Sequence, residues 1–271
     1  MKYNISTIVK SAVMAAAASI IISSCTDNGN SVKVYPIQDN VEPRIMARAL
    51  FDASDELVSS LGLEEGVPAS VSAILVETDG VQILFDAANG APDSQLMPVL
   101  NSLEIAPDDI DYVYITHLHG DHFGGLAYKT ETGIERPSFR NAVVMIPQKE
   151  YDAWMNMPEE QTARLRAVLA LYGERVKTFG YDELLPNGLT AIPAFGHTAG
   201  HTAYRIGDVL IAGDVMHGVA LQLENPEVCA RFDQDKENAV ASRKALIELA
   251  KTEGLKMYGM HFPAPYYIEF K

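Results

Sequence analysis

Short runs of apolar, β-branched and aromatic residues alternate along the chain with longer stretches whose apolar residues recur every three or four positions. The short runs predict strands and the longer stretches predict helices, because side chains repeat every two positions in a strand and every 3.6 in a helix. The predicted strands are 71–76, 81–85, 112–116, 142–146, 189–193, 203–206, 209–212 and 256–260, and the predicted helices are 93–103, 161–172 and 235–252. Strand-rich blocks followed by helices occur in both halves, which predicts an α/β fold with helices outside stacked sheets.

The first 24 residues follow a different pattern. They carry Lys2 and Lys10 without any acidic residue, and residues 11–24 are uncharged. This stretch has the length of a signal-peptide core and is shorter than the roughly 20 apolar residues that span a bilayer. It ends in Ile-Ser-Ser-Cys25, which resembles a bacterial lipobox. The resemblance implies cleavage before Cys25 and lipidation of its thiol, while an ordinary signal peptide followed by a chance cysteine is the alternative.

These features predict the domain organisation and the location of the chain. We expect a lipoprotein signal peptide at residues 1–24, a polar tether rich in Gly, Pro and Asn at 25–43, and one domain at 44–271. The protein would be exported and anchored by lipid to a bacterial membrane, on the periplasmic side or at the cell surface. Cys229 would then be the only free thiol, since the chain has two cysteines.

Composition and charge limit the classes of molecule that the protein is expected to bind. Hydrophobic residues make up 48% and charged residues 21% of the chain, as in ordinary globular proteins. Asp and Glu number 36 against 21 Lys and Arg, which gives a formal net charge of −15. Such a surface repels phosphate backbones, so we expect a small-molecule substrate and no nucleic acid. The sequence leaves the oligomeric state open, with a dimer among the options.

The strongest chemical signal is the run His117-Leu-His119-Gly-Asp121-His122, directly after a predicted strand. Chance placement of its three His and one Asp is on the order of one in a few thousand. His117 and His119 are two positions apart, so in an extended loop both can point to the same side. Asp121 and His122 follow a glycine that permits a sharp turn, and they could face a second metal. Because each zinc takes about four ligands, further donors must come from elsewhere. Candidates at other strand ends are His197, Asp214 and His261.

At these residues the chain resembles the metallo-β-lactamase superfamily. HLHGDH matches the superfamily's signature, GHTAGHT, GDVMH and HFP match its later motifs, and FDAANG at 85–90 resembles the turn before the metal loop. The resemblance implies a four-layer αββα sandwich with two similar halves. It also implies that His117, His119 and His197 bind one metal, that Asp121, His122 and His261 bind another, and that Asp214 bridges both. Asp86 would orient a ligand histidine, with a plain turn residue as the alternative.

The implied activity is hydrolysis by a dinuclear zinc centre, with Mn or Fe as alternatives to zinc. Two metals that share a water lower its pKa, so that a hydroxide can attack an ester, lactone or phosphotriester. The resemblance gives catalytic roles to Asp121 and Asp214. Around residues 71–90 and 213–227 the sequence is most similar to the branch that contains methyl parathion hydrolase and quorum-quenching lactonases. A β-lactamase-like amide hydrolase is the alternative, followed by a non-catalytic metal-binding protein of the same fold.

The substrate pocket is harder to predict than the ligands. Many lactonases of this branch carry a Tyr shortly after the bridging Asp, and here Met216 and His217 occupy that stretch. His201 and His217 are expected beside the ligands or in the pocket rather than among the ligands. Trp154, the only Trp, either covers the substrate or packs on the sandwich. The pocket-lining candidates are Asn89, Phe123, Trp154, His217, Leu221 and Phe262.

Overall fold

Two β-sheets form the centre of the protein, which we describe from a computed structural model covering residues 22–25 and 31–270. The larger sheet has seven strands in the order β1 (Ile22–Cys25), β2 (Ser31–Gln38), β5 (Ser72–Thr78), β6 (Val81–Phe85), β7 (Tyr112–Tyr114), β10 (Val143–Pro147) and β11 (Val176–Phe179). The smaller sheet has five strands in the order β12 (Thr190–Pro193), β13 (Thr202–Ile206), β14 (Val209–Ile211), β15 (Lys256–Tyr258) and β16 (Tyr267–Glu269). Two further hairpin-like pairs join β3 (Arg44–Met46) to β4 (Val67–Ala69) and β8 (Ala127–Lys129) to β9 (Glu135–Pro137).

Helices cover the outer faces of the two sheets. The α-helices are α1 (Asp55–Leu61), α2 (Leu96–Ser102), α3 (Gly120–Phe123), α4 (Gln148–Met155), α5 (Glu159–Tyr172), α6 (Val219–Gln222) and α7 (Lys236–Glu253). Single 3₁₀ turns are η2 (Arg48–Leu50), η3 (Pro107–Asp109), η4 (Gly124–Leu126), η5 (Gly173–Arg175) and η6 (Pro186–Gly188). Within the described residues, none of these helices has both the length and the apolar character needed to cross a bilayer.

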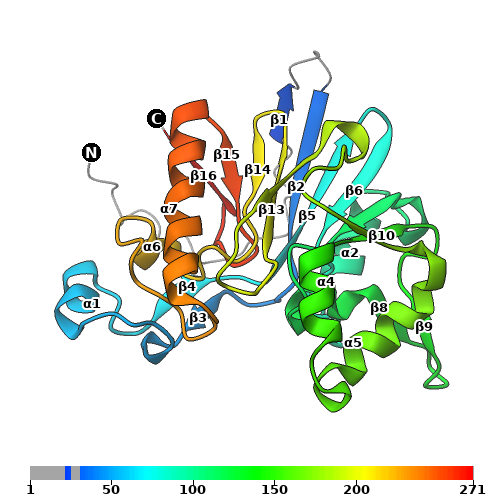
Figure 1. Ribbon diagram of the computed structural model, residues 1–271, viewed down its shortest axis with the longest axis horizontal. Helices are drawn as coiled ribbons and strands as arrows, with labels where there is room; N and C mark the ends of the chain where they lie inside the picture. Colours follow the sequence, from blue (N-terminus) through cyan, green and yellow to red (C-terminus); the bar gives the residue numbers. More distant parts are fainter. Residues whose placement is uncertain (1–21, 26–30, 271) are drawn as a thin grey trace.

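The layers run helix, sheet, sheet, helix (Figure 1). Helix α7 lies on the outer side of the five-stranded sheet, and α2, α4 and α5 lie on the outer side of the seven-stranded sheet. The predicted α/β sandwich is therefore confirmed. Helix α7 begins where the Asp235 side chain accepts a hydrogen bond from the Asn238 N–H, and it ends at Gly254, whose φ is +65°. Both signals are typical of helix ends.

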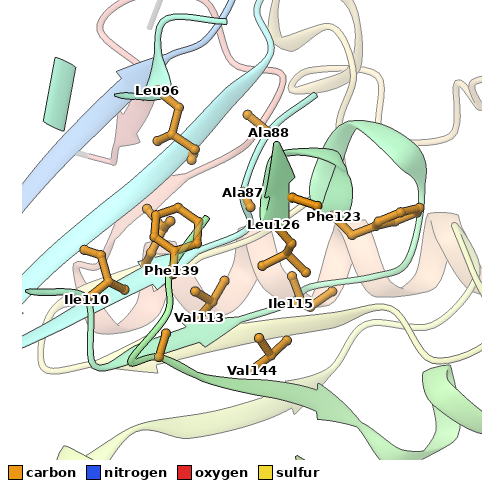
Figure 2. Packing of buried hydrophobic residues seen from close by; sticks show 14 of the residues in the cluster. Ala87, Ala88, Leu96, Ile110, Val113, Ile115, Phe123, Leu126, Phe139 and Val144 are labelled. Carbon is orange, nitrogen blue, oxygen red and sulfur yellow. The ribbon is translucent and has the colours of Figure 1, made fainter. Parts of the chain in front are cut away.

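The alternation of side chains along each strand fills three apolar layers. Between the sheets, Ile74, Val76 and Phe85 pack in one cluster with Tyr204 and Ile211 of the opposite sheet. Beyond the seven-stranded sheet, the side chains pointing the other way meet the helices; Figure 2 shows Val113, Ile115 and Val144 with Leu126 and Phe139. Leu246, Ile247 and Ala250 of α7 close the third layer. Burying both faces of both sheets makes the sandwich rigid at the edge where the polar loops leave it.

The predicted tether is wrong for residues 31–38. This segment is strand β2, which pairs antiparallel with β5 from Val32↔Thr78 to Gln38↔Ser72. Val32, Val34 and Ile37 are buried, so the segment belongs to the core. Lys33, Pro36 and Gln38 within the segment made its composition resemble a tether, although Pro36 is buried with its apolar neighbours. The domain thus includes Ser31, and the predicted signal peptide lies outside the described residues except for β1.

Candidate metal centre

The seven candidate ligands follow the carboxyl ends of strands in both sheets. Strands β6, β7 and β10 run parallel, as do β14 and β15, so the residues that follow them emerge at one edge of the sandwich. The His-rich loop follows β7, His197 follows β12, Asp214 follows β14 and His261 follows β15. Residues dispersed over the sequence therefore meet because ligand sites in such sheets form where strands end.

Three histidine nitrogens converge on one point. Nε2 of His117 lies 3.0 Å from Nδ1 of His119, and Nε2 of His197 lies 3.0 Å from the same atom. The two Nε2 atoms are 3.2 Å apart. A cation bound tetrahedrally at 2.0–2.1 Å would hold its nitrogen ligands about 3.3–3.4 Å apart. The spacing of the three nitrogens is close to this geometry.

Asp214 lies between these histidines and a second group. Its Oδ2 is 3.7 Å from Nε2 of His117 and 3.5 Å from Nε2 of His197. The same oxygen is 3.3 Å from Nε2 of His122 and 3.0 Å from Nε2 of His261. Asp121 completes the second group, with carboxylate oxygens 3.7 Å from Nε2 of His122 and 3.6 Å from Nε2 of His261. Asp214 thus occupies the position of a bridge between two sets of donors.

Hydrogen bonds on the outer nitrogens fix the direction of the lone pairs. Nδ1 of His122 donates to Asp86 Oδ2 at 2.7 Å, Nδ1 of His261 donates to the Ser70 carbonyl at 2.7 Å, and Nδ1 of His197 donates to Asp233 Oδ1 at 3.1 Å. A neutral imidazole carries one N–H, so the Nε2 atom of each ring is a bare acceptor. All three acceptors point inward.

Thr116 extends the same control to His117. Its backbone N–H donates to Asp86 Oδ1 at 2.8 Å, and its hydroxyl donates to Asp86 Oδ2 at 2.7 Å. With that proton committed, the Thr116 oxygen 3.0 Å from Nδ1 of His117 must accept from it. Nε2 of His117 is therefore also a lone pair directed at the centre. Asp86, itself fully buried, orients two candidate ligands at once.

This arrangement fits a cation and is unfavourable without one. The lone pairs of His117 and His197 face each other across 3.2 Å, and neither ring has a proton left to place between them. In the described part of the chain, Nε2 of His122 and Oδ1 of Asp214 are buried and lack a hydrogen-bond partner. Buried polar atoms normally have partners, and those that do not mark a missing ion or water. The donor set of imidazole and carboxylate is one that zinc accepts.

The pKa shifts divide the candidate histidines into two groups. Burial lowers the pKa of His119 and of His197 to about 4, and it holds the pKa of His117 well below its ordinary value. These rings are therefore neutral near pH 7. Burial alone would raise the pKa of Asp214, but the His122 and His261 rings beside it hold that pKa well below its usual range. Burial also lowers the pKa of His122 and of His261, but the charge of Asp214 outweighs it, so that the pKa of His261 is raised and that of His122 lies well above its ordinary value. Three neutral imidazoles thus face an ionised carboxylate, and a cation at the second group would have to displace the protons of His122 and His261.

Comparison with known proteins identifies the family. The sequence of residues 66–251 matches the family described as the Metallo-beta-lactamase superfamily. The chain belongs to the metallo-beta-lactamase superfamily. A curated relative, the anti-Pycsar protein Apyc1 of Saccharibacillus brassicae, is 29% identical over 170 residues, which are 60% of this chain and 64% of that protein. The chain therefore covers less than two thirds of the length of this relative.

Two solved structures share the fold across nearly the whole superfamily domain. The hydrolase AbOPH aligns with a TM-score of 0.75 and 22% identity over 93% of both chains. AidC, described as a dizinc quorum-quenching lactonase, aligns with a TM-score of 0.76 and 18% identity over 92% of both chains. At these identities the likeness concerns the fold.

The two further histidines differ in their surroundings. Nδ1 of His201 donates to the Ala194 carbonyl, and its Nε2 accepts the backbone N–H of Asp214 at 2.9 Å. Both nitrogens are committed, so His201 positions Asp214. His217 lies against the centre, with Nε2 3.3 Å from Asp214 Oδ2 and its ring stacked on His261 at 5.1 Å. Its Nδ1 is buried and, among the described residues, has no hydrogen-bond partner.

The structure places the pocket-lining candidates in different surroundings. Asn89 and Phe123 line a hollow of about 560 Å³ that also reaches Asp121. Trp154 is half-buried in α4, with its ring centroid 5.8 Å from that of His119 in an edge-to-face arrangement. The prediction that Leu221 and Phe262 line the pocket is wrong, because both side chains are almost fully buried in apolar clusters. Because they lie in or near the motifs GDVMH and HFP, both residues were expected to face the pocket, but their side chains pack into the core.

Sequence reasoning missed Glu150, a buried carboxylate that connects three segments of the centre. Oε1 accepts the Leu118 N–H at 2.9 Å and the Trp154 indole N–H at 2.7 Å. Oε2 accepts the Thr198 hydroxyl at 2.8 Å and the Gly200 N–H at 2.9 Å. Burial raises the pKa of Glu150, and these four donors oppose that effect. Its position just after β10, at the same sheet edge, was the available signal. Asp233 accepts the hydrogen bond from His197 and forms a buried ion pair with Arg243 at 3.1 Å. No signal in the sequence pointed to Asp233.

Glu150→Gln should destabilise the protein by about 2 kcal/mol, because the amide replaces one acceptor with a donor that faces other donors. Urea unfolding should show this shift. Glu159→Gln, at an exposed position in the first turn of α5, is the matched control and should change little. Equal unfolding midpoints for Glu150→Gln and the parent protein would show that Glu150 does not hold the loops together.

Proposed function

We propose that this protein is a dinuclear metal-dependent hydrolase, with zinc as the metal, acting on a small ester, lactone or phosphotriester. The observation that carries the proposal is the convergence of five imidazole nitrogens and two carboxylates at one sheet edge. His117, His119 and His197 would hold one cation, and Asp121, His122 and His261 the other. Asp214 would bridge the two, and Asp86 would orient His117 and His122.

The residues of the centre would divide the work as follows. When bound, the two cations supply Lewis acidity and an activated water. Asp121, whose side chain is 30% exposed, would accept a proton from an attacking water. Asp214, almost fully buried, would fix the spacing of the centre. No side chain is required as a nucleophile.

The substrate class rests on the family and on related proteins. Membership of the metallo-beta-lactamase superfamily favours ester or lactone cleavage, as does the fold shared with the hydrolase AbOPH and the dizinc quorum-quenching lactonase AidC. A curated N-acyl homoserine lactonase of Bacillus thuringiensis, 26% identical over 166 residues, supports the same class. A β-lactamase-like amide hydrolase is the second candidate, because the superfamily is named for that activity.

A substrate panel tests the proposal. Zinc-loaded protein should hydrolyse members of a set of lactones, aryl esters and phosphotriesters, and a chelator should abolish this activity. A chromogenic cephalosporin should be a poor substrate. Efficient cephalosporin hydrolysis with inert lactones would favour the amide hydrolase, and a protein that binds metal but cleaves nothing would favour a non-catalytic role.

We further propose export and lipid anchoring through Cys25. Five residues separate Cys25 from β2, so a lipid on Cys25 would hold the domain close to the membrane. In a bacterial host, full-length protein should incorporate labelled palmitate and partition with membranes, and Cys25→Ala should remove both properties while Cys229→Ala retains them. Label in Cys25→Ala, or soluble full-length protein, would contradict anchoring.

A further inference from the structure

One side of the candidate metal centre is open, and arginines lie on that side. Of the candidate ligands, His117, His122, His197, Asp214 and His261 have side chains at most 5% exposed. Asp121 is 30% exposed, and it lines the hollow of about 560 Å³. The hollow therefore offers a substrate a route to Asp121; His119, the other partly exposed candidate ligand, lies against Trp154. The other lining residues of the hollow are Arg44, Asn89, Gly90, Gly120, Phe123, Gly124 and Arg164.

The charge of this hollow is opposite to that of the whole chain. The chain carries a formal net charge of −15, yet two arginines line the hollow and Asp121 is its only acidic lining residue. Asp121 faces His122 and His261, and in the proposed function its charge is taken up by a cation. No further carboxylate among the lining residues offsets the positive charge of the two arginines.

The two arginines differ in how they are held. Arg164, from α5, forms an ion pair with Glu135 of β9. Arg44, from β3, is exposed and has no carboxylate partner within the part of the chain that the structure describes. Arg48, Arg140 and Arg205 each have an acidic partner, whereas Arg136, Arg175 and Arg231 have none among the described residues, so Arg44 is distinguished by its place at the hollow. In so acidic a chain, an unpaired guanidinium beside the open ligand suggests recognition of an anion.

We propose that the substrate carries an oxyanion, a carboxylate or a phosphate, on its non-reacting part, and that Arg44 and Arg164 bind this group. The proposal rests on the proposed hydrolase function and narrows its substrate class. The scissile group would lie at Asp121 and the anion at the arginines, with the Phe123 ring and the backbone of Gly90 and Gly124 lining the space between. Guanidinium forks suit both carboxylate and phosphate oxygens.

Two esters of similar length test the charge preference. The zinc-loaded protein should hydrolyse mono-p-nitrophenyl glutarate with a kcat/KM about tenfold above that for p-nitrophenyl butyrate, and 0.5 M NaCl should reduce this difference. Arg44→Gln and Arg164→Gln should each lower kcat/KM for the glutarate ester about tenfold, mainly through KM, and leave the butyrate ester within about twofold. Arg205→Gln, which removes a similar surface arginine paired with Glu253, should change neither.

Binding of unreactive anions separates this inference from the proposed function. Calorimetry on the zinc-loaded protein should show that glutarate or inorganic phosphate binds, that Arg44→Gln weakens the preferred anion about tenfold, and that glutaramide binds poorly. The preferred anion distinguishes a carboxylate from a phosphate. Arg44-dependent anion binding without ester hydrolysis would support anion recognition by the arginines and would contradict the proposed hydrolase function. Equal hydrolysis of both esters, unaffected by either arginine, would overturn the inference and leave the hydrolase standing.

Discussion

Asp214→Asn is expected to lower kcat/KM by at least about 10³-fold, which corresponds to about 4 kcal/mol of lost transition-state stabilisation. Oδ2 of Asp214 lies between 3.0 and 3.7 Å from four imidazole nitrogens of the candidate ligands. An asparagine of the same size lacks the negative charge and directs an amide donor at lone pairs. Assays of zinc-reconstituted protein with the best ester or lactone of the panel, together with elemental analysis, measure both the activity and the retained metal.

The control for this change is Asp182→Asn, an exposed aspartate in a turn. It should retain activity and metal content. Circular dichroism should show that Asp214→Asn keeps its secondary structure, because the apolar layers of the sandwich do not include Asp214. A folded Asp214→Asn protein with unchanged turnover and metal content would show that Asp214 does not bridge a metal pair.

Asp86→Asn should cause the second largest loss, a drop in metal affinity of about 10- to 100-fold, expressed mostly at the site of His122. Asp86 now accepts from Nδ1 of His122 at 2.7 Å and from the Thr116 hydroxyl, which in turn accepts from His117. An amide donor facing Nδ1 would move the imidazole proton to Nε2 and remove the lone pair that points at the centre. Metal titration with a competing chelator should give one tight and one weakened equivalent.

Asp93→Asn, at an exposed position in the same connection, is the matched control and should bind metal as the parent protein does. Asp86→Ala adds a second comparison, because it removes the acceptor without introducing a donor. If Asp86→Asn and the parent protein bind metal with the same affinities, Asp86 is a turn residue and does not set the tautomers of the histidines.

The sequence predicted the parts of this protein that depend on local pattern. Strand 81–85 and the register of apolar side chains on α5 follow from periodicity, and the His-rich loop was visible because its residues are contiguous. Strand β2 was missed because its partner β5 lies about 40 positions away, and only that pairing buries Val34 and Ile37. Tertiary contacts decided this segment, not its composition.

The candidate ligands could be predicted from the sequence, but most of the residues that position them could not. Asp86 was expected from its place before the metal loop, but Glu150 and Asp233 act through backbone amides and imidazole nitrogens that only the assembled fold brings to them. Arg44 and Arg164 gave no signal, because they lie on separate elements and meet the same hollow only in the folded chain. Leu221 and Phe262 show the reverse, since residues adjacent to a motif can point into the core.

An anomalous difference map from crystals of zinc-loaded protein, measured on both sides of the zinc edge, tests the metal centre most directly. It should show two peaks about 3.5–4 Å apart. One should lie roughly 2.0–2.2 Å from nitrogens of His117, His119 and His197, and the other at that distance from Asp121, His122 and His261, with Asp214 touching both. A map with no peak at these residues, or with a single peak held instead by His197, His217 and Asp233, would contradict a dinuclear centre.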